Sequence, residues 1–141
     1  MVCTFIGHRD TPFSIREQLE AAIIALIKQG VCHFYVGNKG NFDFLAQDVL
    51  SRVIAVYTGV GFDIVLSALD EKPLLEKATS TIFPEELALV PKKFAFCKRN
   101  DYMLKKADFV IAYATHSFSN SYKFIQKAQK SGCTVINLAK I

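Results

Sequence analysis

The sequence contains no tryptophan. Its four cysteines show no CxxC spacing, and this absence argues against a metal-binding or redox motif. No apolar run approaches the roughly 20 residues that span a bilayer. The opening stretch MVCTFIGHRD lacks the basic and apolar segments of a signal peptide. Neither sign of charge dominates, because the net charge is only +4. We therefore expect a cytoplasmic protein with reduced thiols, without membrane contact and without the basic footprint of a nucleic-acid-binding domain.

The composition that remains is typical of one globular domain. Of the 141 residues, 51% are hydrophobic and 21% are charged. A chain of this length can bury roughly two-thirds of its unfolded surface, so it needs no disulfide or metal to hold its core. We expect a single domain over residues 1–141.

Alternating patterns predict the secondary structure. Short apolar, β-rich runs predict strands over 2–7, 33–37, 62–69, 109–113 and 133–138. Apolar residues at helical period predict helices over about 15–27, 42–53, 96–106 and 122–130. Ser14 and Glu17 have the spacing of a capping box, and Gly30 and Gly132 are placed to end helices. Strands that alternate with helices indicate an α/β, Rossmann-like doubly wound fold, with a mainly parallel five-stranded sheet covered on both faces.

Residues 71–95 break this alternation. Pro73, Pro84 and Pro91 interrupt the segment and no period holds, which is typical of a functional loop or an interaction surface. Its apolar residues have to be buried from solvent by another surface, so we expect a homo-oligomer. These residues are Ile82, Phe83, Leu87, Leu89 and Val90.

Polar residues gather where predicted strands end, which is where doubly wound sheets bind ligands. We predict a ligand site of Gly7, His8, Arg9, Gly37, Asn38, Lys39, Gly40, Asn41, Asp43, Arg99, Asn100, His116, Ser119, Asn120 and Ser121. The two glycines of the 37–43 stretch allow a tight turn whose amides could receive phosphate at a helix N-terminus. The alternative there is an ordinary turn, with Asn41 as the helix cap.

The other stretches also have two interpretations. Arg9 could bind a phosphate or carboxylate, or belong to an ordinary polar loop. Arg99 and Asn100 should share the inward side of their helix, where the cation needs a bound anion or a salt bridge to Asp43 or Asp10. One residue of 119–121 should cap the last helix, with or without a ligand. His8 and His116 could meet at the crevice, but no spacing resembles a metal site.

The stretches CTFIGHRD, FYVGNKGNFD, ADFVIAYATHSF, TVINL and the segment from Pro91 to Met103 resemble bacterial proteins of the SLOG superfamily. That group joins YpsA-like proteins, the DNA-processing protein A core and the "lonely guy" phosphoribohydrolases. The resemblance implies a Rossmann-like fold with a site for a nucleotide or an ADP-ribose-like ligand. Its G-x-x-G-x-x-D signature falls on Gly37, Gly40 and Asp43.

Two departures bear on the activity. Where relatives have a glycine-rich turn before the last helix, this chain has residues 119–121, Ser-Asn-Ser. The phosphoribohydrolases also need a glutamate after that turn, and no glutamate follows Glu86. Binding or sensing of a nucleotide-derived ligand is therefore our first hypothesis. The alternatives are a phosphoribohydrolase or N-glycosidase, with Asp43 or Asp10 as the acidic group, and a nucleic-acid or protein-interaction module.

Overall fold

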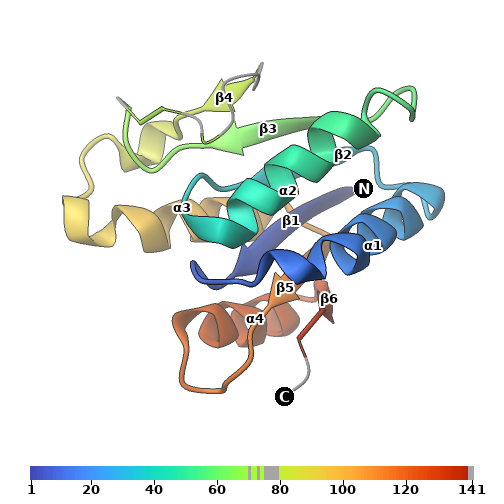
Figure 1. The fold of residues 1–141 in the computed structure, drawn as a ribbon. Coiled ribbons are helices and arrows are strands. Elements are labelled where there is room, and N and C mark those ends of the chain that lie inside the picture. The colour runs from blue at the N-terminus through green and yellow to red at the C-terminus, as the bar shows by residue number, and fades with distance from the viewer. Residues whose placement is uncertain (70, 73, 75–79, 140–141) are drawn as a thin grey trace.

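A computed structural model describes residues 1–69, 71–72, 74 and 80–139 (Figure 1). The strands are β1 (Val2–Gly7), β2 (His33–Val36), β3 (Gly61–Val65), β4 (Thr81–Ile82), β5 (Phe109–Tyr113) and β6 (Thr134–Asn137). The α-helices are α1 (Arg16–Lys28), α2 (Gly40–Val53), α3 (Lys92–Lys106) and α4 (Asn120–Lys130), and the 3-10 helices are η1 (Phe13–Ile15) and η2 (Glu85–Leu87).

All neighbouring strands are parallel, in the order β4-β3-β2-β1-β5-β6. The chain runs outward from β1 through β2 and β3, then returns to place β5 on the other side of β1. Helices α1 and α2 cover one face of the sheet, and α3 and α4 cover the other (Figure 1). The doubly wound fold is thus confirmed. Its topological switch point, where such folds bind ligands, lies at the carboxyl end of β1.

The core has one layer on each face of the sheet. On the α1–α2 side, the ring of Phe5 stacks on Phe34 at 5.9 Å and meets Phe42 edge-on at 6.3 Å between centroids. On the α3–α4 side, smaller residues such as Val110 and Ala112 pack against Ile125. Strands buried on both faces are near-continuous apolar runs, which is why the sequence predicted β1 and β5 with the observed bounds.

The predicted count of five strands was wrong, because the sheet has six. The added strand β4 has two residues, and Thr81 and Ile82 pair with Ile64 and Val65 of β3. Two residues are too few for a periodic pattern, so only the exposed edge of β3 makes them a strand. Part of the predicted irregular segment 71–95 therefore has regular structure, and its positions 73 and 75–79 lie outside the described residues.

Three local predictions have mixed outcomes. Gly30 and Gly132 follow helix ends with φ of 110° and 91°, as predicted. The capping box was wrong: Ser14 lies in η1, and the residue at the N-cap of α1 is Ile15, which makes no side-chain cap. Helix α3 begins at Lys92, earlier than the predicted residue 96. Its first turn carries exposed lysines without an apolar period, so the sequence pattern did not indicate this turn.

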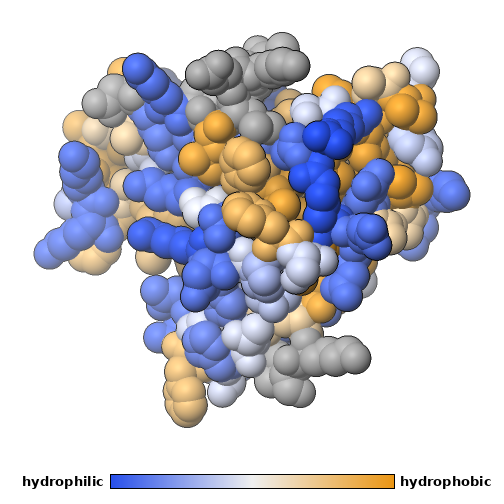
Figure 2. All heavy atoms as spheres, in the orientation of Figure 1, coloured by the Kyte–Doolittle hydropathy of each residue, from blue (hydrophilic) through white to orange (hydrophobic). Residues whose placement is uncertain are grey.

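Figure 2 shows hydrophilic side chains over much of the face that carries α1 and α2, with hydrophobic side chains between them. No helix in the described part of the chain combines the length and apolar character that crossing a membrane requires.

Gly7→Ala should destabilise the fold. A Cβ at Gly7 would lie 2.3 Å from Cγ of Phe42, which is itself buried in the core. Phe42 and the backbone must shift to make room for the added Cβ. This shift should lower the free energy of unfolding by roughly 1–3 kcal/mol, as at other overpacked sites. Urea denaturation measures the change. Gly61→Ala is the matched control, because its Cβ would meet only His33, at 3.8 Å; equal stability of the two variants would contradict the packing described here.

Candidate functional site

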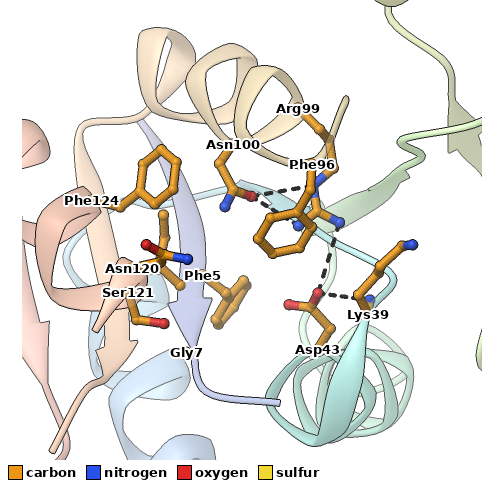
Figure 3. A pocket seen from close by; sticks show the side chains of 11 residues that line it. Phe5, Gly7, Lys39, Asp43, Phe96, Arg99, Asn100, Asn120, Ser121 and Phe124 are labelled. Carbon is orange, nitrogen blue, oxygen red and sulfur yellow. Dashed lines mark hydrogen bonds and ion pairs between the residues drawn. The ribbon is translucent and has the colours of Figure 1, made fainter. Parts of the chain in front are cut away.

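A cavity of about 30 Å³ opens at the carboxyl end of β1 (Figure 3). Three helices meet there: α2 and α4 by their N-terminal ends and α3 by its middle. The lining residues are Phe5, Ile6, Gly7, Lys39, Asp43, Phe96, Arg99, Asn100, Asn120, Ser121 and Phe124. Seven of them belong to the predicted ligand site, so the fold brings together residues from four separate stretches of the sequence.

Arg99 is the largest buried side chain at this cavity, with 2% of its surface exposed. Its Nε and Nη2 donate to Oδ1 of Asn100 at 3.2 and 2.8 Å. Its guanidinium lies over the ring of Phe96, 4.5 Å from the centroid. Nη1 has no hydrogen-bond partner among the described residues. The prediction that Arg99 and Asn100 share the inward side of their helix is thus confirmed, and one donor of Arg99 is left unsatisfied.

Asp43 is the nearest counter-charge to that donor. Its Oδ2 lies 3.9 Å from Nη1 of Arg99 and accepts a hydrogen bond from the amide of Lys39 at 2.9 Å. Burial raises the pKa of the Asp43 carboxyl, and Arg99 and the Lys39 amide offset only part of that rise. Burial likewise lowers the pKa of Arg99, with Asp43 as the main opposing influence. The two charges attract but are too far apart to form a hydrogen bond.

Gly37 makes room for this pair. A Cβ there would lie 2.5 Å from both Nη1 of Arg99 and Oδ2 of Asp43. Gly40 has a φ of 87°, and its Cβ would lie 2.6 Å from Cα of Arg9. Both glycines of the 37–43 stretch are therefore needed where the backbone passes close to other groups. Gly37 lies against a buried ion pair, and Gly40 lies against the loop after β1.

The amides at the start of α2 are partly used by the protein itself. The Lys39 amide donates to Asp43, and the Asn41 amide donates to the carbonyl of Arg9 at 2.8 Å. The alternative of an Asn41 cap was wrong, because Lys39 occupies the N-cap and the Asn41 side chain donates to the carbonyl of Thr11. Of the 37–43 stretch, it is thus Lys39 and Asp43 that line the cavity.

Asn38 is buried but bonds to the loop after β3. Its Nδ2 donates to the carbonyl of Lys72 at 2.7 Å and to Glu71 at 3.2 Å, while its Oδ1 accepts from the Leu74 amide at 2.7 Å. Gln47, which sequence reasoning did not select, donates to the same Oδ1 and to the carbonyl of Gly37. The Asn38 side chain therefore positions this loop.

His8 and His116 do meet, as predicted. Their rings stack with centroids 5.0 Å apart at 13°. Nε2 of His8 accepts from the amide of Thr115 at 2.9 Å, which requires this nitrogen to be unprotonated. Neither histidine lines the cavity.

At α4 the predicted cap is confirmed. Oγ of Ser119 accepts from the amide of Tyr122 at 3.1 Å, while Asn120 and Ser121 line the cavity.

Arg9 is exposed, and its guanidinium lies 5.5 Å from the centroid of the Phe96 ring, which the Arg99 guanidinium also contacts. Asp10 is exposed and does not line the cavity.

Sequence reasoning missed Phe96 and Phe124, which form apolar walls of the cavity in Figure 3. Phe96 lies three residues before Arg99, a helical spacing that could have indicated it. Among the described residues, no group of three or more histidine, cysteine, aspartate or glutamate side chains is placed to hold a metal ion.

Comparisons with known proteins give no family assignment: no family model matches the chain, and no curated protein matches it.

His8→Gln should make the stability less sensitive to acid. Burial, and then the neighbouring His116, lower the pKa of His8 below its ordinary value of 6.5, although Asp10 opposes them. Between the two pKa values the unfolded chain binds more protons at His8, so stability falls as the pH drops through this window. The fall in Tm from pH 7.5 to 5.5 should be smaller in the variant than in the wild type. An equal fall in both proteins would contradict this role of His8.

Proposed function

We propose that the cavity binds the phosphate of a nucleotide or nucleotide-derived ligand. One observation carries the proposal: Nη1 of Arg99 is buried beside the cavity without a hydrogen-bond partner among the described residues. A buried donor left unsatisfied costs roughly 1–3 kcal/mol, and more when it is charged. An oxyanion in the cavity would accept a charge-assisted hydrogen bond from it and remove that cost.

The surroundings favour an anion over a neutral group. Lys39 adds a positive charge to the lining, and the N-terminal end of α4 is exposed to the cavity through Asn120 and Ser121. The positive end of a helix dipole stabilises phosphate. Asp43 contributes a negative charge that opposes an anion, whereas Arg99 and Lys39 both favour one; burial raises the pKa of the Asp43 carboxyl.

The size of the cavity suggests which part of the ligand enters it. A space of about 30 Å³ is far too small for a whole nucleotide, so only a small terminal group such as a phosphate could enter it. In this proposal the sugar and base lie at the mouth, within reach of exposed Arg9. The resemblance to the SLOG superfamily supports a nucleotide as the ligand, and its signature positions Gly37 and Asp43 lie at this ion pair.

Ligand binding should depend on Arg99. We expect AMP, ADP-ribose, NAD or a cyclic dinucleotide to raise the Tm at millimolar concentration, since a site of micromolar affinity stabilises by a few kcal/mol. Arg99→Lys keeps the charge but loses the planar fork, so calorimetry should show an affinity at least about tenfold lower, or ~1.4 kcal/mol.

Arg52→Lys on the exposed end of α2 is the matched control and should bind like the wild type. Lys39→Ala provides a surface variant for the case in which the Arg99 substitution prevents folding, and it should also weaken binding. The proposal fails if none of the compounds raises the Tm, or if every variant binds equally well.

A second function rests on Asp43. A carboxyl group with a raised pKa at a ligand cavity is suited to general-acid catalysis. In N-glycosidic hydrolysis it would donate a proton to the departing base as the bond to the sugar breaks. Water would add to the sugar carbon, and the proton that this water loses would restore the Asp43 acid. Asp10, which is exposed and outside the lining, is a poorer candidate for this role.

Asp43→Asn separates binding from catalysis. If the protein is a hydrolase, it should release free base from a nucleoside monophosphate, and the variant should lose at least about a hundredfold in rate, as is usual for loss of a general acid. Chromatography of the products measures the rate, and calorimetry shows whether the variant still binds. An unchanged rate in the variant would remove Asp43 from the mechanism.

A further inference from the structure

An apolar groove lies away from the cavity, at the β4 end of the sheet. Phe83, Leu87, Val90 and Ala95 are among the residues that line this space of about 320 Å³. Beside it Leu89, in the turn between η2 and α3, has 97% of its surface exposed. The chain between η2 and the start of α3 is the yellow segment at the left of Figure 1. The exposed leucine and the open groove together form an apolar surface, which is suited to contact with a second copy of the chain.

The charges around Leu89 are arranged symmetrically. Glu86 and Glu85 stand three and four residues before it, and Lys92 and Lys93 stand three and four residues after it. All four side chains are exposed, and none of them forms an ion pair with another described residue. The segment 85–93 is therefore acidic at one end, basic at the other and apolar in the middle.

Two copies of this segment have complementary charges when they lie side by side in opposite directions. In a two-fold interface the same patch meets its copy, and each contact occurs twice. With the axis near Leu89, an antiparallel arrangement brings Glu85 and Glu86 of each copy to Lys93 and Lys92 of the other. The two Leu89 side chains then meet near the axis, beside the apolar groove of each copy. A parallel arrangement would instead bring like charges together.

We propose that a second copy of this chain docks on the 85–93 segment, through an isologous interface centred on Leu89. This interface is separate from the ligand cavity, although α3 contributes residues to both. Because the patch is short, it falls at the small end of specific interfaces, and we expect a weak dimer whose population rises with protein concentration.

Sedimentation velocity of the full chain, across a wide series of protein concentrations, tests the proposal. The wild type should shift from monomer to dimer with concentration. Leu89→Lys should remain monomeric, since it removes the apolar centre and sets two like charges at the axis. Lys123→Glu with Lys130→Glu on exposed positions of α4 is the matched charge control and should dimerise like the wild type.

Charge reversal identifies the pairing itself. Glu85→Lys with Glu86→Lys, and separately Lys92→Glu with Lys93→Glu, should each weaken self-association at least about tenfold. A mixture of the two variants should dimerise again, because every contact is then between opposite charges. Acidic residues in the first turn of α3 agree with its helix dipole, so the second variant should fold.

Two outcomes would overturn the proposal. One is a wild type that remains monomeric throughout the concentration series. The other is a dimer that survives Leu89→Lys and both charge reversals, since such a dimer must use another surface. Failure of the mixture to recover would overturn the antiparallel pairing.

Discussion

The burial of one cation organises the carboxyl edge of this sheet. Arg99 has 2% of its surface exposed, so its charge must be met by neighbours drawn from several elements. Asn100 takes two of its donors, Phe96 stacks on its plane, and Asp43 lies opposite its remaining nitrogen. Gly37 is required because any side chain there would occupy the same space. The relative positions of α2, α3 and the end of β2 thus depend on this guanidinium.

The same constraint gives the site its chemistry. A distance of 3.9 Å to Asp43 leaves Nη1 attracted to a carboxylate but without a hydrogen bond. The donor therefore remains directed at the cavity, where an added oxyanion would complete its bonding. The proposed phosphate site depends on this nitrogen, which has no hydrogen-bond partner among the described residues.

Most of the fold could be predicted because its signals are local and periodic. Strands β1 and β5 have the expected bounds, and the glycines after α1 and α4 adopt the positive φ that helix ends favour. The failures occurred where a distant partner decides the structure. Strand β4 exists through its pairing with β3, and the start of α1 follows the turn after Pro12 instead of the Ser14–Glu17 pattern.

The candidate site divides in the same way. By itself the sequence determined that polar residues follow several strands, since strand ends and glycines can be recognised locally, and parallel topology brings those ends to one edge. Only the tertiary structure decided what each polar group is bonded to. Asn38 and Asn41 lie within two residues of Lys39 and are equally polar, yet their side chains bond to other loops, whereas Arg99 keeps an unsatisfied donor at the cavity. Hydrogen bonds between residues some 30 or more positions apart leave no trace in local composition, so the distinction between structural and available groups appears only when the chain is folded.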